Sequence, residues 1–165
     1  KLLGATVIAT GGSDAKLQRV LAYGADHVIN TEHGFREQVK ALTGGRGADV
    51  IYDPVGGDIF DESTRCINFD GRLLIIGFTS GRIASVPTNI PLIKGFSVMG
   101  VRAGEYGRQF PEKGAENLQI IWDWVHEEKT RPHVHAELPL SQSVEGFRML
   151  QQREVIGKLV ICPDR

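Results

Sequence analysis

The chain has 165 residues, a length typical of one domain or of one domain with a short extension. Hydrophobic residues make up 41% and charged residues 24%, as in soluble globular proteins, and the net charge of −1 disfavours a nucleic acid or an anionic membrane surface as partner. Cys66 and Cys162 lie far apart without CxxC spacing, which favours a reducing compartment, the cytoplasm or the mitochondrial matrix. No apolar run is long enough to span a membrane and no signal peptide is recognisable. Because the chain begins with Lys1 and not with Met, we expect a fragment of a longer protein.

Short β-rich runs alternate with helical patterns from the N-terminus onward. Residues 5–10 (ATVIAT) form a continuous apolar run that predicts a strand buried on both faces. Ser13 can cap the helix that follows, and Gly24 is placed to end it. The next strands are predicted at residues 27–30, 48–53, 72–77 and 96–101, with helices around residues 35–42, 58–67 and 89–93.

The longest predicted helix covers residues 113–128, with Leu118, Ile121, Trp122 and Val125 on one face. Beyond Pro132 we predict a strand at 134–138, a helix at 144–151 and a strand at 158–161. Strands that alternate with helices indicate right-handed βαβ units, and hence an α/β fold with a parallel sheet.

Glycine-rich turns follow three of the predicted strands, at residues 10–13 (TGGS), 53–57 (DPVGG) and 77–81 (GFTSG). In an open parallel sheet, ligands bind beyond the carboxyl ends of the strands, and glycine lets a flat, charged ligand approach the backbone. A single turn of this kind means little, because strand–helix turns prefer glycine even where no ligand binds. Three of them at strand exits favour the interpretation that a ligand binds there. The dinucleotide fingerprint GxGxxG is absent from the chain. If residues 5–10 are the second Rossmann strand, the first strand and its glycine loop precede Lys1.

The exit of the first predicted strand bears on the choice of cofactor. An NAD site needs an acid there to accept the ribose hydroxyls, whereas this exit offers Thr10, Gly11, Ser13 and Lys16. A helix start, a hydroxyl and an ammonium group favour the 2′-phosphate of NADP instead. Ser13 as a simple cap and Lys16 as a solvated residue stay open as alternatives, and Asp14 opposes the phosphate interpretation.

The segments VIATGGSDAKLQRVLAYGADHVIN (residues 7–30), LTGGRGADVIYDPVGG (42–57), GRLLIIGFTSGR (71–82) and GKLVI (157–161) resemble the medium-chain dehydrogenase/reductase superfamily. Within this superfamily they are most similar to the zinc-independent quinone oxidoreductase branch, which includes ζ-crystallin. The resemblance covers nearly the whole chain. It implies a Rossmann-type, doubly wound, three-layer domain that lacks its first strand and glycine loop here. Residues 1–130 would be the NADP-binding domain, incomplete at its N-terminus, and residues 131–165 would return towards a catalytic domain that precedes Lys1.

The same resemblance assigns roles to individual residues. Gly11 stands where NAD-dependent relatives carry their acid, and this chain has Thr31 where the branch often has a tyrosine near the 2′-phosphate. The resemblance places Lys16 at the adenosine ribose or its phosphate, Val55 beside the adenosine, Gly77, Phe78 and Thr79 beside the nicotinamide with Val101 nearby, and Lys158 at the cofactor from the C-terminal segment. With Thr10 and Ser13 from the strand exit, the residues expected to bind NADP(H) are Thr10, Gly11, Ser13, Lys16, Val55, Gly77, Phe78, Thr79, Val101 and Lys158.

The implied activity is hydride transfer from NADPH to a quinone or an α,β-unsaturated carbonyl, by a homodimer that pairs through the edge strand from Phe96 to Val101. The chain alone is expected to be inactive, and no catalytic residue can be named. His133 and His135 lack a third ligand, so we predict no metal site. Asp53 either bonds a ribose hydroxyl or caps the turn before Pro54. A non-enzymatic NADPH-binding or dimerisation module stays open as the alternative function.

Overall fold

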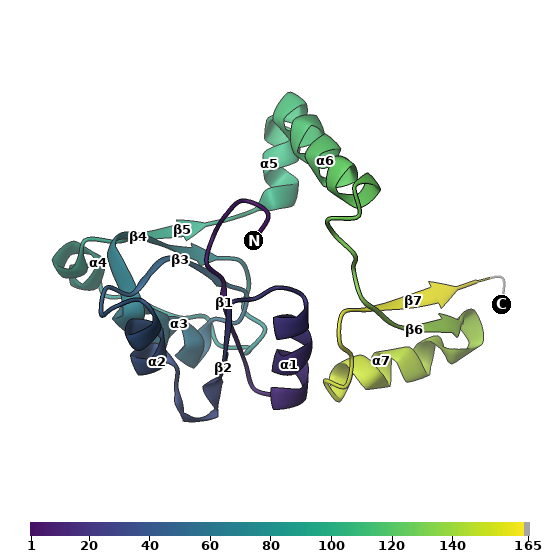
Figure 1. Ribbon diagram of the computed structural model, residues 1–165, viewed down its shortest axis with the longest axis horizontal. Coiled ribbons are helices and arrows are strands. Elements are labelled where there is room, and N and C mark those ends of the chain that lie inside the picture. The colour runs from purple at the N-terminus through teal and green to yellow at the C-terminus, as the bar shows by residue number, and fades with distance from the viewer. Residues whose placement is uncertain (164–165) are drawn as a thin grey trace. The chain divides into compact units, whose positions relative to one another are not determined.

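The computed structural model describes residues 1–163 and divides into two compact units, residues 1–111 and a second unit that begins at Glu112 (Figure 1). The first unit alternates strands with helices, as predicted. Its strands are β1 (Ile8–Gly11), β2 (His27–Asn30), β3 (Ala48–Asp53), β4 (Ile67–Ile75) and β5 (Ser97–Gly100). Its helices are α1 (Asp14–Ala22), the 3-10 turn η1 (Thr31–His33), α2 (Arg36–Leu42), α3 (Gly57–Cys66), α4 (Asn89–Lys94) and α5 (Ala103–Gln109).

All strand pairs of the first unit are parallel, but they fall into two sheets. Strand β1 pairs with β2, and β3, β4 and β5 pair in that order. The Rossmann order 3-2-1-4-5-6 places the first strand between the second and the fourth. With β1 as the second strand, the break between β1 and β3 falls where the absent first strand was expected. The predicted fold class, an α/β Rossmann-type parallel sheet without its first strand in this chain, is confirmed.

Helices lie on both faces of these strands. Ile8 of β1 and Ile51 of β3 pack into one apolar cluster with Val39 of α2. Helices α2 and α3 therefore cover the same face of both sheets. Side chains along a strand alternate between its faces, so Gly11 faces away from that cluster. A Cβ atom on Gly11 would lie 3.3 Å from Cδ2 of Leu17. Helix α1 therefore covers the opposite face, as in a doubly wound sheet.

A second apolar cluster joins α3 to β4 and β5. It contains Phe60, Ile67, Phe96 and the fully buried Leu73. Burying one such side chain stabilises the fold by ~1.5–3 kcal/mol. The β-rich pattern of residues 72–77 predicted only the second half of β4. The strand begins earlier, at Ile67, and its register with β3 is irregular between Ala48 and Val50.

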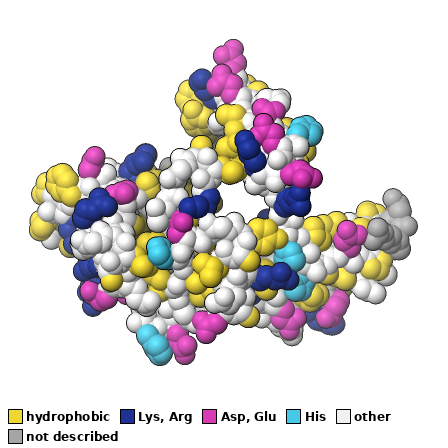
Figure 2. Space-filling view, viewed as in Figure 1, with side chains coloured by type: hydrophobic (Ala, Val, Ile, Leu, Met, Phe, Trp, Pro, Cys, Tyr) yellow, Lys and Arg dark blue, Asp and Glu magenta, His cyan; other side chains and the backbone are white. Residues whose placement is uncertain are grey.

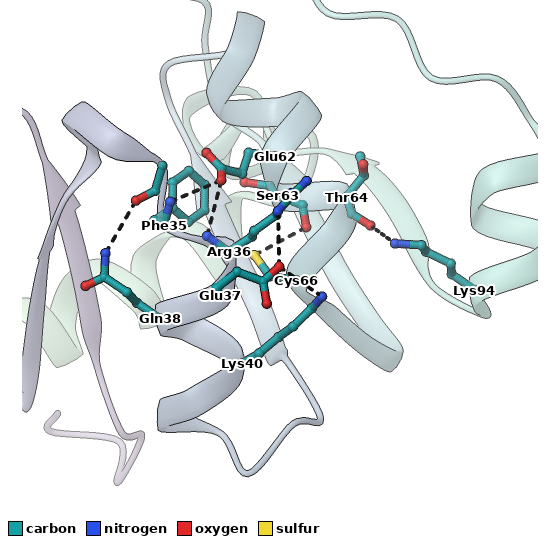
Figure 3. A network of polar contacts seen from close by, with 11 residues as sticks. Phe35, Arg36, Glu37, Gln38, Lys40, Glu62, Ser63, Thr64, Cys66 and Lys94 are labelled. Atoms are coloured by element: carbon teal, nitrogen blue, oxygen red, sulfur yellow. Dashed lines mark hydrogen bonds and ion pairs between the residues drawn. The ribbon is translucent and has the colours of Figure 1, made fainter.

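Helix α3 caps the start of α2 through Glu62 (Figure 3). Oε1 of Glu62 accepts hydrogen bonds from the backbone N–H groups of Phe35, at 3.1 Å, and of Arg36, at 3.3 Å. The first N–H groups of a helix have no partner within the helix, so this carboxylate satisfies donors that would otherwise lose their hydrogen bonds. The contact also fixes α2 against α3.

Cys66 ends α3 inside the first apolar cluster. Its side chain is buried, and Sγ lies 3.7 Å from the carbonyl oxygen of Ser63. Burial raises the pKa of this thiol to about 11, because the thiolate would lose its hydration. Cys66 and Cys162 are both free thiols.

The long helix α6 (Pro111–His126) leads into the second unit. This unit also contains β6 (Val134–Pro139), the 3-10 turn η2 (Leu140–Gln142), α7 (Ser143–Gln151) and β7 (Lys158–Cys162). Strands β6 and β7 are parallel and α7 connects them, which confirms the predicted strand–helix–strand pattern. A Cβ atom on the buried Gly146 would lie 3.1 Å from Leu138, so the glycine allows α7 to approach β6 closely. The functional boundary expected after residue 130 stays a prediction.

Besides the early start of β4, three features of the structure differ from the sequence-based expectation. Strand β1 covers Ile8–Gly11 and not residues 5–10, and it is not buried on both faces, since Thr10 is exposed. The pattern did not predict α5. The apolar face expected on α6 exists, but its residues Leu118, Ile121, Trp122 and Val125 are 37–53% exposed. Exposed hydrophobic side chains are spread among charged ones on the surface (Figure 2). Within residues 1–163, no helix combines the length and the apolar character needed to cross a membrane.

Replacing Glu62 by alanine should lower the free energy of unfolding by about 1 kcal/mol, because the first N–H groups of α2 lose their acceptor. The control is Glu37→Ala, which removes an exposed carboxylate that pairs with Arg36 and Lys40 on the same helix. Exposed pairs of this kind contribute little. Urea unfolding of the two variants measures the difference, and equal losses would show that Glu62 is no cap.

Because the pKa of Cys66 is raised in the folded state, the free energy of unfolding should depend on pH above about 9, the ordinary pKa of the thiol. The protonated thiol favours the folded state, so its contribution is complete below pH 9 and is lost as the pH rises towards 11, where the folded thiol ionises. The difference in unfolding free energy between the wild type and Cys66→Ala should therefore shrink over this interval. Urea unfolding at several pH values measures it, and a constant difference would contradict the burial of the thiol.

Candidate cofactor site at the strand exits

The exit of β1 forms a turn with an open backbone. Thr10 is exposed, and a Cβ atom on Gly12 would meet no atom within 4 Å. At Gly11, by contrast, a Cβ atom would lie 3.3 Å from Cδ2 of Leu17, so a side chain at this position would require the end of the Leu17 side chain to move slightly. The turn thus has a closely packed glycine at position 11 and open space beside the glycine at position 12.

Ser13 precedes the first turn of α1 in extended conformation, as the sequence predicted for a cap residue. Its carbonyl oxygen accepts the first helical hydrogen bond, from Leu17 N–H at 2.9 Å, but its hydroxyl makes no capping hydrogen bond. The simple capping role considered for the Ser13 side chain is therefore not observed. The hydroxyl is left available beside the helix start, where the backbone favours an anion.

Asp14 and Lys16 flank this turn with opposite charges. Residues two positions apart on an α-helix project about 200° apart, so the two side chains leave α1 on opposite sides. The Asp14 carboxylate lies towards the end of β2, where its Oδ1 accepts a hydrogen bond of 2.6 Å from the side-chain amide of Asn30. Lys16 is half-buried on the other side of the helix.

The exits of β3 and β4 are joined by backbone hydrogen bonds that continue beyond the strands. The N–H groups of Ile76, Thr79 and Ser80 donate to the carbonyl oxygens of Asp53, Pro54 and Val55, at 2.9, 3.1 and 3.0 Å respectively. Four predicted site residues, Val55, Gly77, Phe78 and Thr79, therefore lie in one pair of interlocked loops.

Glycine is required where these two loops touch. Gly56 has φ +69° and ψ −158°, a conformation open almost only to glycine. A Cβ atom on Gly56 would lie 3.0 Å from the Phe78 ring, and one on Gly77 would lie 3.2 Å from the carbonyl oxygen of Pro54. The glycines of DPVGG and GFTSG thus allow two backbones to approach each other, which the ligand interpretation of these turns did not foresee.

The buried carboxylate of Asp53 shapes the first of these loops. Its Oδ1 accepts hydrogen bonds from the N–H groups of Val55, at 2.8 Å, and Gly56, at 2.9 Å. Asp53 therefore caps the turn, one of the two roles considered for it, and its bond to a ribose hydroxyl stays a prediction.

Arg82 is a site-supporting residue that the sequence did not reveal. Its Nη2 lies 2.8 Å from Oδ1 of Asp58 and 2.5 Å from Oδ2 of Asp61, both on α3. These hydrogen bonds, with Asp61 contributing most, raise the pKa of the guanidinium group. The end of the β4 exit loop is thereby tied to the helix that follows the β3 exit loop. Two acids one turn apart on α3 and an arginine after a glycine turn could have suggested this ion pair. The signal is weak, because many acids and arginines on protein surfaces have the same spacing without forming a pair.

The remaining predicted residues lie elsewhere. Val101 directly follows β5, and its N–H group donates to the carbonyl oxygen of Ile75 at 3.0 Å. Lys158 begins β7 in the second unit. His135 accepts a hydrogen bond of 3.4 Å from Ile156 N–H through Nδ1. Among the described residues, no three His, Cys, Asp or Glu side chains are grouped to hold a metal ion. The cofactor roles of all ten predicted residues stay predictions.

Comparisons with known proteins match this geometry to a family. A family model described as "Zinc-binding dehydrogenase" matches residues 1–120. The bovine (Bos taurus) quinone oxidoreductase-like protein 2 is 36% identical over 161 residues, which cover 97% of this chain and 46% of the relative. The chain thus spans about half the length of this relative.

Two solved structures have the same fold. The Escherichia coli quinone oxidoreductase complexed with NADPH is 29% identical, with a TM-score of 0.84, over 98% of this chain and 51% of that chain. A structure named as an NAD-dependent alcohol dehydrogenase is 35% identical, with a TM-score of 0.82, over 97% and 44%. This chain belongs to the zinc-binding dehydrogenase family, and it is the C-terminal cofactor-binding portion of a medium-chain dehydrogenase/reductase of the quinone oxidoreductase branch.

Proposed function

We propose that the protein containing this chain binds NADPH and transfers a hydride to a quinone or an α,β-unsaturated carbonyl compound. The observation that carries the cofactor choice is the β1–α1 turn. Position 11 is a glycine and carries no acid, the Ser13 hydroxyl makes no capping hydrogen bond, and Lys16 leaves the helix on the side away from Asp14. A quinone oxidoreductase of the same fold was solved as a complex with NADPH, which supports the proposal.

Electrostatics makes such a turn selective between the two nicotinamide cofactors. A 2′-phosphate carries about −1.5 to −2 charges at neutral pH. A carboxylate ~4 Å away would repel each unit of that charge by ~4 kcal/mol at an effective dielectric constant of ~20. The helix start, Ser13 and Lys16 would instead attract the phosphate. Because one structure of the same fold is named as NAD-dependent, the choice rests on these residues and not on the family.

The interlocked loops would bind the adenosine and the nicotinamide of the cofactor. NADPH supplies the hydride, so the work of the protein is to bind, orient and exclude water. In our proposal, Val55 flanks the adenosine, and Gly77, Phe78 and Thr79 border the nicotinamide. Their backbones are held by hydrogen bonds between the loops, which would limit the positions open to the ring. The substrate class is taken from relatives named as quinone oxidoreductases.

We also propose that the protein is a homodimer that pairs along the strand from Phe96 to Val101. Strand β5 is an edge strand of the sheet β3–β4–β5. Met99 on this strand is 45% exposed, and an apolar edge strand left uncovered invites aggregation. Pairing of two copies would cover this edge.

Replacing Lys16 by alanine in the full-length protein should raise the Kd for NADPH about tenfold or more, because a hydrogen bond to a charged group contributes ~1.5–3 kcal/mol. The Kd for NADH, which lacks the 2′-phosphate, should change little. Fluorescence titration with both cofactors measures the effect. Arg19→Ala, which removes an exposed cation from the same helix, is the control and should leave both constants nearly unchanged. Equal losses for NADPH and NADH would contradict the phosphate role, and a wild type that prefers NADH would contradict the cofactor assignment.

Replacing Gly56 by alanine should weaken the binding of both cofactors alike, because it disturbs the interlocked loops and not the phosphate turn. The backbone conformation alone should cost ~1–3 kcal/mol in folding stability, and the clash with Phe78 adds to it. Gly81→Ala is the matched control, since Gly81 also has a positive φ, +83°, but a Cβ atom there would meet nothing within 4 Å. Cofactor titration and unfolding of both variants test the interlock. If Gly81→Ala weakens cofactor binding as much as Gly56→Ala does, close contact between the two loops is not the cause of the loss.

A further inference from the structure

The β4 exit loop, residues 76–82, folds over the start of α3. A Cβ atom on Gly57, the first residue of α3, would lie 2.8 Å from Oγ of Ser80. One on Gly56, directly before the helix, would lie 3.1 Å from the carbonyl oxygen of Arg82. The end of the loop therefore lies in direct contact with the backbone that begins α3.

Backbone hydrogen bonds hold only the first part of this loop. The N–H groups of Ile76, Thr79 and Ser80 donate to carbonyl oxygens of residues 53–55. In the part of the chain that the structure describes, the backbone of residues 82–86 makes no hydrogen bond to a strand or a helix. The side chain of Arg82 makes the next polar contact between the loop and the rest of the unit. The end of the loop thus depends on an ion pair.

Arg82 contacts two acids of unequal exposure. Its Nη2 lies 2.8 Å from Oδ1 of Asp58, whose side chain is fully exposed, and 2.5 Å from Oδ2 of Asp61, which is 48% exposed, as Arg82 is. Water screens the first pair more strongly, so Asp61 is the main partner. Because an exposed pair contributes little to the stability of a whole domain, we expect its effect on the loop itself.

We propose that Arg82 is a positioning residue for hydride transfer, because its ion pair with Asp61 holds the β4 exit loop against α3. The loop carries Phe78 and Thr79, which border the nicotinamide in the proposed function, and the inference rests on that function. Arg82 acts through the loop and needs no contact with the cofactor. The turn assigned to the 2′-phosphate belongs to the other sheet, β1–β2, so the preference for NADPH over NADH should not depend on Arg82.

The first measurement needs no cofactor. Hydrogen exchange in the full-length protein, followed by mass spectrometry, reports the opening of the loop through the amides of Thr79 and Ser80. Arg82→Ala should speed this exchange about threefold, the size expected for an exposed ion pair, and Asp61→Asn should do the same. The double variant should exchange no faster than either single variant, since both remove one contact. Asp58→Asn should have a smaller effect.

Salt tests the same contact without a substitution. The Debye length falls from ~10 Å at 0.1 M salt to ~3 Å at 1 M, which weakens an exposed ion pair. In 1 M NaCl, loop exchange in the wild type should therefore approach that of Arg82→Ala, whereas Arg82→Ala itself should respond little. Arg82→Lys keeps the positive charge and should keep most of the salt response.

The second measurement follows the reaction. In a single turnover, a hydride from bound NADPH and a proton from solvent convert 1,4-benzoquinone to hydroquinone and leave NADP⁺. Arg82→Ala should lower this rate constant at saturating NADPH about threefold, because Phe78 and Thr79 are held less firmly. Arg82→Lys should restore most of it, and the ratio of the Kd values for NADPH and NADH should stay that of the wild type.

The chain offers a matched control at Arg108. Its Nη1 lies 2.9 Å from Oε2 of Glu105, an exposed pair within α5 that joins no loop to a helix. Arg108→Ala should leave loop exchange, its salt response and the rate of hydride transfer unchanged. Arg82→Gln removes the charge but keeps most of the side chain, and it serves if Arg82→Ala does not fold.

The outcomes separate the inference from the proposed function. A wild type that transfers no hydride from NADPH to 1,4-benzoquinone or to an α,β-unsaturated ketone would overturn the proposed function. An active wild type, with loop exchange unchanged in Arg82→Ala and Arg82→Gln, would overturn the inference alone. Faster loop exchange with an unchanged rate of hydride transfer would show that Arg82 only stabilises the loop. Faster exchange along the whole chain would show a general structural role, and either result would also overturn the inference.

Discussion

The apolar cluster beneath α2 and α3 is the interaction on which the first unit depends. Ile8 and Ile29 come from one sheet, Ile51 comes from the other, and Phe35 and Val39 contribute from the segment that connects them. The two sheets are hydrogen-bonded separately, so apolar packing joins them across the break between β1 and β3. This packing places the exits of both sheets in one compact unit. Val50 and Tyr52 of β3 lie on the strand face opposite to Ile51 and are exposed.

Much of the fold could be predicted from the sequence because strands buried in parallel sheets have continuous apolar runs. The ranges expected for β2 and β3 are the observed ones, and the helices α1, α2, α3 and α7 begin and end within a residue or two of the expected positions. The pattern failed where local periodicity is weak. The segment of α5, AGEYGRQ, contains two glycines and a single large hydrophobic residue. It therefore has no apolar stripe that would predict a helix. The early start of β4 was missed because the irregular segment Asn68–Gly71 interrupts the alternation of the strand.

The candidate site was predictable in its location but not in its internal contacts. Parallel strands end at a common edge, so the glycine turns could be assigned to the site from the sequence alone. Spacing could not show that Gly56 and Gly77 serve the contact between two loops, that Asp53 caps its own turn, or that Asn30 binds Asp14. These are tertiary contacts between residues whose separation along the chain carries no signal. In this site the acids are fixed by neighbours, Asp14 by an amide, and Asp58 and Asp61 by Arg82.

The central claim is that the β1–α1 turn receives the 2′-phosphate of NADPH. A crystal structure of the full-length protein with NADPH bound measures this directly. The account predicts phosphate density within hydrogen-bond distance of Ser13 and the first N–H groups of α1, with Lys16 directed towards it. Phosphate density at another part of the sheet edge, or a turn covered by protein without room for an anion, would contradict the account.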